Sequence, residues 1–328
     1  MTRKLGGCLI AVFLLLSVGS FPIAWASDGE ILHYRPEPRP LKFVLSIAGK
    51  SHALSLWETS PLVEQEDVLN LSQKVETVGD GLLNIMWTVQ GINREQEVPK
   101  TNSIHLVPRG GSGYKRKDII GNSGHTLINL LGAVREAKAI PHIGSVYFHP
   151  ESLAGPPLDI YGIATMIYPQ FPLRSLKEGD RWKIKDKITI EPAEALLIGG
   201  LGTLKHELSM IVKRDLEYTL NGYVQKGSYT AAHIGFKGTF SMEGEMITQS
   251  GGDFIEADGK CSGEYYFALE EGLLMESLIK TKVNEEKSTS GNTVHWFNAE
   301  TNMAVFLGQP TAPLTWLTEK DLHFVLVE

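Results

Sequence analysis

The sequence is poor in cysteine and has no long hydrophobic run beyond its first 26 residues. Its two cysteines are Cys8 and Cys261, and Cys8 lies in a predicted leader, so the mature chain cannot form an intramolecular disulfide. A membrane-spanning helix needs roughly 18 or more apolar residues, and no such stretch follows the leader. We therefore expect no transmembrane helix in the mature protein, and a structural role for the single remaining thiol.

Recognisable catalytic motifs are also absent. There is no Gly-x-Ser-x-Gly, no His-Glu-x-x-His and no His-x-x-x-His, and the glycine-rich segment 199–205 lacks the Gly-Lys-Ser/Thr ending that holds a phosphate. We assign no catalytic residue and no cofactor. One alternative remains open: an exported hydrolase or metalloenzyme could use His125, His142 and His149. A zinc site in the proline-rich joint would consist of His142, His149 and Glu151. In the other interpretation these are exposed loop histidines.

Positive charge is scarce. The formal net charge is −7, and removal of the leader with Arg3 and Lys4 changes it to −9. An acidic chain argues against nucleic acid as a partner. The one concentrated basic segment contains Lys115, Arg116 and Lys117 beside several glycines. It is either a contact for an anionic polymer or lipid head group, or a solvated loop.

The first 26 residues predict export. Arg3 and Lys4 precede an apolar run, and Ala24-Trp25-Ala26 matches a small-x-small cleavage site. We expect cleavage after Ala26 and a periplasmic or extracellular location for the mature protein.

From about residue 41 onward the apolar residues recur with a period of two, which predicts β-strands. In residues 182–190 the even positions are apolar, except for Asp186, while lysines occupy most odd positions. Short glycine-containing segments between such stretches predict hairpin turns. These segments are Gly79-Asp80-Gly81, Asn221-Gly222, Asp258-Gly259, Glu271-Gly272 and Ser290-Gly291-Asn292.

These patterns predict an all-β chain, with a minor α contribution possible, folded as a curved antiparallel meander or half barrel. A proline-rich joint between Pro141 and Pro172 divides it into two β units, 27–154 and 155–328, which are similar in style. Residues 122–140 fit either an amphipathic helix or a hairpin that turns at Gly132. Lysines on the predicted outward faces argue against a transmembrane barrel, which needs an apolar band facing lipid.

Two stretches resemble a family. Residues 171–182 contain Phe-Pro-Leu and then Leu-Lys-Glu-Gly-Asp-Arg-Trp, and residues 263–274 read Gly-Glu-Tyr-Tyr-Phe-Ala-Leu-Glu-Glu-Gly-Leu-Leu. Both are similar to segments of uncharacterised secreted bacterial β-sheet proteins with the half-barrel architecture of lipoprotein carriers. The resemblance covers about residues 155–300. It implies a curved antiparallel sheet around an apolar groove, and it supplies no catalytic residues.

Together these features favour an exported, non-catalytic binding protein of the bacterial envelope. The expected partner is an apolar small molecule, a lipid, or an envelope protein that adds a strand to a sheet edge. The candidate groove residues, which at strand spacing also suit an ordinary core, are Trp182, Phe236, Phe240, Met242, Tyr266 and Trp296.

Overall fold

The computed structural model describes residues 29–53, 62–79, 81–95, 103–107, 120–121, 123–138, 166–199, 202–248, 251–289, 293–298, 303–308 and 314–327. This part of the chain consists of strands, turns and extended segments, so the all-β prediction is confirmed. No helix in it is long and apolar enough to cross a membrane. The predicted leader lies outside the described residues.

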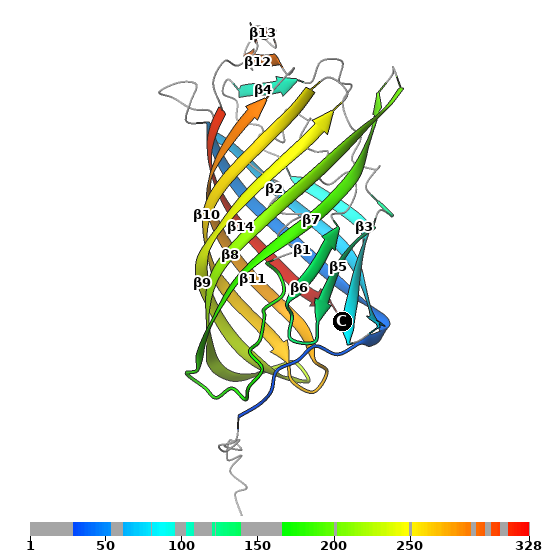
Figure 1. Ribbon diagram of the computed structural model, residues 1–328, viewed down its shortest axis with the longest axis vertical. Coiled ribbons are helices and arrows are strands. Elements are labelled where there is room, and N and C mark those ends of the chain that lie inside the picture. The colour runs from blue at the N-terminus through cyan, green and yellow to red at the C-terminus, as the bar shows by residue number, and fades with distance from the viewer. Residues whose placement is uncertain are drawn as a thin grey trace, which may run out of the picture.

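The strands form one closed barrel and one small separate sheet (Figure 1). The barrel order is β1-β14-β11-β10-β9-β8-β7-β6-β5-β3-β2, and the small sheet is β13-β12-β4. The early strands are β1 (Glu37–Ala53), β2 (Leu62–Val78), β3 (Leu82–Glu95), β4 (Ser103–Val107), β5 (Ser123–Asn129) and β6 (Val134–Lys138). The later strands are β7 (Arg181–Gly199), β8 (Gly202–Lys226), β9 (Tyr229–Thr248), β10 (Gly251–Ala268), β11 (Leu273–Thr289), β12 (Thr293–Asn298), β13 (Met303–Gly308) and β14 (Leu314–Val327).

The curved antiparallel meander is confirmed, and its ends meet, because residues 42–53 of β1 pair with residues 316–327 of β14. Strands from 27–154 and from 155–328 therefore belong to the same sheet. Eleven strands cannot close with antiparallel neighbours alone, since an odd ring needs one parallel pair. That pair is β6 with β7, at Ala137 opposite Ile190 and Lys138 opposite Glu191. The long connection that a parallel pair requires is the segment containing the proline-rich joint.

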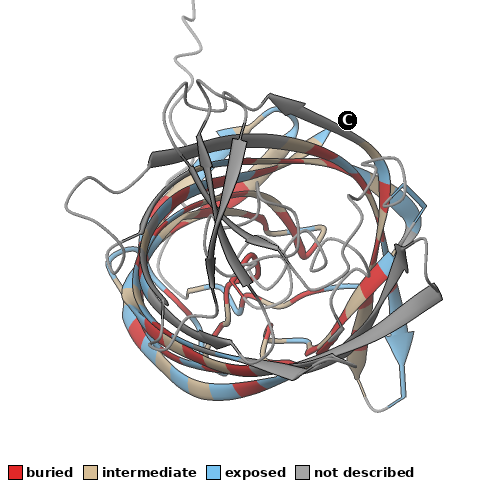
Figure 2. Ribbon diagram, turned by 90° about the horizontal axis from the view of Figure 1, so that it is seen from above, coloured by how far each residue is buried: buried red, intermediate tan, exposed pale blue. Residues whose placement is uncertain are grey.

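Two extended segments fill one end of the barrel (lower end in Figure 1). They are residues 29–36 and 166–180, joined by a bridge between Glu30 and Leu176. The Tyr34 hydroxyl donates to the Pro169 carbonyl over 3.0 Å, and the Tyr34 ring stacks on Phe171. Figure 2, which looks down the barrel, shows buried chain inside the ring of strands. These segments supply aromatic side chains to a core that the strands enclose.

Within the predicted helix or hairpin at 122–140, residues 123–138 form a hairpin of β5 and β6. Gly132 has a φ of 85°, and a Cβ there would lie 2.3 Å from the Pro169 carbonyl oxygen. A side chain at this position would therefore collide with the segment that fills the barrel end, and a helix is excluded by the pairing of the two strands.

Two of the predicted turns are wrong. Asn221-Gly222 lies inside β8 at a register shift, and the chain turns later, around Gly227. Asp258-Gly259 lies in the middle of β10. Gly259 faces inward there, and a Cβ on it would come within 2.3 Å of the Phe240 ring. The glycine allows close packing instead of a reversal. Turns at Gly79, Gly81 and Gly272 are confirmed by their positive φ values, and the predicted turn Ser290-Gly291-Asn292 lies outside the described residues.

Candidate functional site

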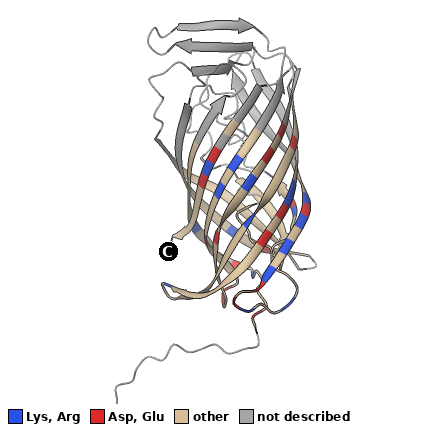
Figure 3. Cartoon of the chain, turned by 90° about the vertical axis from the view of Figure 1, so that its left-hand side faces the viewer, with Lys and Arg blue, Asp and Glu red and all other residues tan. Residues whose placement is uncertain are grey.

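The two faces of the barrel wall have opposite chemistry. Along β7, β8, β9, β10, β11 and β14, inward residues are mostly buried and apolar, and outward residues are mostly exposed and polar. Figure 3 shows where lysine, arginine, aspartate and glutamate occur along these strands. A transmembrane barrel has the reverse arrangement, with an apolar exterior and a polar interior. The lysines at 183, 185, 187, 280 and 282 are all exposed, as the sequence pattern predicts.

Trp182 and Phe236 lie in the lower core. The Trp182 ring stacks on Tyr218 at 5.3 Å between centroids, and Phe236 stacks on Tyr265 at 4.8 Å. The Trp182 indole donates to the Gln170 carbonyl over 2.7 Å. Because ring faces and the indole N–H are already partnered by protein, these two side chains belong to the packed core.

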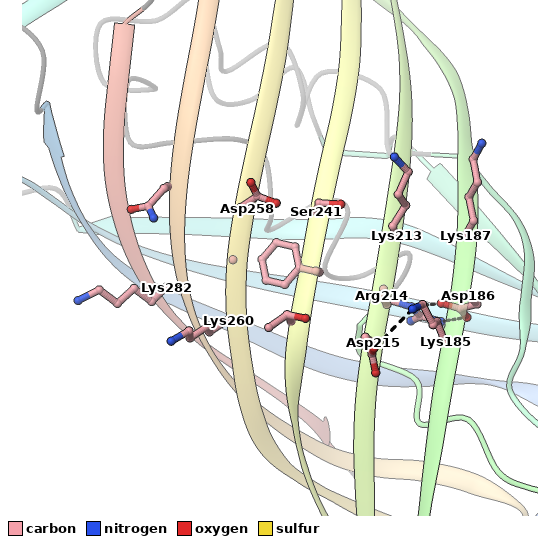
Figure 4. Close-up of a pocket in the computed structure, with 14 residues that line it drawn as sticks. Lys185, Asp186, Lys187, Lys213, Arg214, Asp215, Ser241, Asp258, Lys260 and Lys282 are labelled. Atoms are coloured by element: carbon pink, nitrogen blue, oxygen red, sulfur yellow. Dashed lines mark hydrogen bonds and ion pairs between the residues drawn. The ribbon is translucent and has the colours of Figure 1, made fainter.

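A buried ion pair lies above this aromatic core. Arg214 donates from Nε to Asp186 Oδ1 over 2.9 Å and from a terminal nitrogen to Oδ2 over 2.5 Å (Figure 4). The arginine side chain is 1% exposed and the aspartate 23%. Burial alone would lower the pKa of Arg214, but the hydrogen bonds to Asp186 and the nearby Tyr218 raise it above its ordinary value. The arginine is therefore charged, and the bidentate geometry fixes both side chains.

Apolar inward side chains lie beside this pair and beyond it. Phe240 and Met242 of β9 are 3% and 1% exposed and face inward. Neighbouring inward positions on the adjacent strands are Ile188, Val212, Ala257 and Val283. Phe240 and Met242 are thus the two predicted groove residues that lie above the aromatic core.

The remaining predicted groove residues lie elsewhere. Tyr266 is on the outer face, where its ring stacks on His233 at 4.8 Å and Lys226 approaches it at 3.7 Å. Its neighbour Tyr265 takes the inward position. Trp296 belongs to β12 of the small sheet, and its side chain lies outside the described residues.

The predicted histidine site is only partly described. His125 is on the outer face of β5, with Nε2 3.1 Å from Glu136 Oε1. His142, His149 and Glu151 lie outside the described residues, as do Lys115, Arg116 and Lys117. Within the part of the chain that the structure describes, no group of three His, Cys, Asp or Glu side chains is placed to hold a metal ion.

Cys261 faces the interior between β9 and β11. Burial raises the pKa of its thiol to about 12, with Arg214 acting weakly in the opposite direction. A thiol with such a pKa is protonated at neutral pH and is a poor nucleophile. This agrees with a structural role for Cys261.

The pairing of Arg214 with Asp186 was not predicted from the sequence. The signal was present, because Asp186 interrupts an apolar face and Arg214 has the inward parity of Val212 and Leu216 on the next strand. Two charged residues of opposite sign at inward positions of adjacent strands predict a buried pair once the register is known.

No family model matches the chain, and no curated protein matches it. The similar solved structures include three outer-membrane proteins. OmpT of Vibrio cholerae, in its trimer form, is 10% identical over 87% of this chain and 99% of its own, with a TM-score of 0.18. OmpF of Salmonella typhi in complex with daunomycin is 7% identical over 86% of this chain and 96% of its own, with a TM-score of 0.25. OccK2 (OpdF) of Pseudomonas aeruginosa is 6% identical over 88% of this chain and 98% of its own, with a TM-score of 0.19. Similarity at this level carries no inference about function.

Proposed function

We propose that this chain is an exported, non-catalytic binding protein of the bacterial envelope, and that it holds an apolar or lipid-like ligand inside the barrel above the Asp186–Arg214 pair. The observation that carries the proposal is the combination of eleven strands with an apolar inner wall. Wall side chains alone fill a barrel of about eight strands, and the lumen widens as strands are added.

At the lower end of the barrel, the space between the strands is wider than their inward side chains can fill. There the wall side chains do not suffice, and residues 29–36 and 166–180 enter the ring to complete the core. Above Met166, whose carbonyl accepts from the Tyr265 hydroxyl over 2.7 Å, the wall continues with Phe240, Met242 and Val212 facing inward. An apolar molecule at this level would bury its surface against that wall, which is favourable by about 25 cal/mol for each Å² removed from water.

The test uses the mature protein purified without detergent from its own envelope. Native mass spectrometry followed by organic extraction should reveal a retained hydrophobic compound, and the stripped protein should bind a fluorescent long-chain fatty acid as a probe. Ala257→Phe adds a ring at an inward position and should abolish probe binding. Ser241→Phe adds the same ring on the outer face and is the matched control.

The proposal fails if the purified protein carries no hydrophobic compound and the stripped protein does not bind the probe. It also fails if Ala257→Phe and Ser241→Phe reduce binding equally, because the binding would then not involve the lumen. Thermal unfolding of both variants establishes that each is folded before binding is compared.

A further inference from the structure

The outer faces of six neighbouring strands carry charged and polar side chains in register. One row follows the strand order from β7 to β14 and reads Lys183, Glu217, Lys237, Ser262, Lys280 and Asp321. The row above it reads Lys185, Asp215, Thr239, Lys260, Lys282 and Glu319. Residues in one row are direct cross-strand neighbours, so their side chains interact.

In both rows the positions on β9, β10 and β11 carry no acidic residue. Their six positions, which we call the lysine patch, are Lys237 and Thr239 of β9, Lys260 and Ser262 of β10, and Lys280 and Lys282 of β11. All six side chains are exposed, and together they line part of a surface hollow of about 740 Å³. The patch concentrates four positive charges on a chain whose formal net charge is −7.

Three of these lysines form no ion pair with a described carboxylate, although Glu217 lies opposite Lys237 and Asp321 lies opposite Lys280 on the neighbouring strands. Lys282 pairs with Glu319 at 2.8 Å, whereas Lys237, Lys260 and Lys280 have no ion pair with any acidic residue that the structure describes. Lys260 is directly opposite Lys282 across the β10 and β11 ladder, an arrangement that disfavours folding. Figure 4 shows Lys260 and Lys282 on their neighbouring strands.

Lysines outside the patch on the same wall differ in this respect. Lys183 lies 3.5 Å from Glu217, Lys185 lies 3.9 Å from Asp215, and Lys213 pairs with Glu243. The wall thus has paired lysines, Lys183, Lys185 and Lys213 on β7 and β8 and Lys282 on β11, and the three patch lysines without an ion pair on β9, β10 and β11. Repulsion between unpaired lysines is relieved when an anion lies between them.

We propose that the lysine patch binds a linear glycan that carries sulfate or phosphate groups. Lysine ammonium groups bind such oxyanions as compact point charges. The hydroxyls of Thr239 and Ser262 lie among the lysines and can hydrogen-bond the sugar hydroxyls between the charged groups.

The flanking acids favour a narrow ligand over a lipid surface. Asp215 and Glu217 border the patch on β8, and Glu319 and Asp321 border it on β14. The acid-free area spans two strand spacings, about 10 Å, and along β10 it lies between the outward residues Asp258 and Glu264. A single polymer chain fits within that width, whereas an anionic bilayer would also contact the acidic borders. Because the patch is on the outside of the barrel, this proposal does not depend on a ligand in the lumen.

The test measures binding of the mature protein to heparin, a sulfated glycan, with uncharged dextran as the blank. The triple variant Lys237→Gln, Lys260→Gln, Lys280→Gln removes the unpaired lysines. Each lysine near an anionic surface contributes on the order of fivefold in affinity, so we expect a loss of roughly 100-fold. The matched control is Lys183→Gln, Lys185→Gln, Lys213→Gln, which changes net charge equally but removes paired lysines. It should weaken binding by about fivefold or less.

Selective loss in the first triple variant, with a reduced dependence of affinity on salt, supports the proposal. Equal loss in both triple variants overturns it, since binding would then follow net charge alone. Absence of wild-type binding to heparin near physiological salt also overturns it, as does stronger binding to phosphatidylglycerol vesicles than to heparin. All substituted side chains are exposed, and the single variant Lys260→Gln provides the same comparison if a triple variant unfolds.

Discussion

Charged side chains are stabilised differently on the inner and outer faces of the same strands. Inside, Arg214 and Asp186 form a buried pair with two hydrogen bonds, and each charge replaces the water that the other loses on burial. Outside, Lys213 and its neighbours form exposed pairs in water, where each charge is solvated with or without its partner. We therefore expect substitutions at inward charged residues to cost more stability than substitutions at outward ones.

The largest contrast should come from adjacent residues of β8. Arg214→Ala leaves Asp186 in a largely buried site without its cation and should reduce the free energy of unfolding by about 3–5 kcal/mol. Lys213→Ala removes an exposed pair with Glu243 and should cost no more than about 1 kcal/mol. Urea unfolding of the two variants measures both values.

A double variant tests whether the cost arises from the unpaired charge. Asp186→Leu combined with Arg214→Met removes both charges and should recover most of the stability that Arg214→Ala loses. If the double variant is as unstable as Arg214→Ala, the pair contributes through specific geometry that apolar side chains cannot replace.

Much of the fold could be predicted because alternation is a local signal. The inward and outward faces of β7 follow directly from Trp182, Lys183, Ile184 and Lys185. The hairpin turn at Glu271-Gly272 could be predicted for the same reason, since a turn glycine is recognised from its immediate neighbours.

The features of the fold that could not be predicted depend on contacts between residues that are far apart in the sequence. Gly259 was expected in a turn because its local sequence suits one, yet its reason for being glycine is the Phe240 ring on the next strand. The lysine patch likewise exists only after β9, β10 and β11 are placed in register. Closure of the sheet depends on β1 meeting β14, and no local pattern encodes that pairing.

Alkaline pH should destabilise the inner face before it affects the outer face. Burial raises the pKa of Tyr218 to about 12 and raises the pKa values of Tyr34, Tyr168 and Tyr265 as well. Tyrosine in the unfolded chain titrates near 10, so the contribution of these groups is complete below pH 10 and is lost as pH rises towards 12 and beyond. For Tyr218 the loss amounts to about 2–3 kcal/mol.

The measurement is urea unfolding at several pH values between 8 and 12, with tyrosinate absorbance recorded in parallel. Tyr218→Phe should show a shallower decline in stability with pH than the wild type. A wild-type stability that is unchanged across this range would contradict the burial of these hydroxyls.

The close packing of β9 against β10 provides a smaller contrast. Gly259→Ala places a methyl group against the Phe240 ring and should cost about 1–3 kcal/mol. Asp258→Ala, one residue away on the outer face, should change stability by about 0.5 kcal/mol or less. Adding Phe240→Leu to Gly259→Ala should recover part of the loss, and additive effects in this double-mutant cycle would exclude a direct clash.

The smallest contrast compares two neighbouring tyrosines. Tyr265→Phe removes a hydroxyl that donates to the Met166 carbonyl over 2.7 Å in a buried site, and it leaves that carbonyl without this donor. The expected loss is about 1–2 kcal/mol, because a buried acceptor that loses its partner bears the cost of desolvation. Tyr266→Phe removes a 3.3 Å contact with Glu264 on the outer face, where water replaces it, and should cost only a few tenths of a kcal/mol. Thermal unfolding of both variants resolves this difference. Equal losses of stability would mean that this hydrogen bond does not hold the segment 166–180 inside the barrel. A loss confined to Tyr265→Phe would mean that the inward Tyr265 hydroxyl anchors the segment that fills the barrel end.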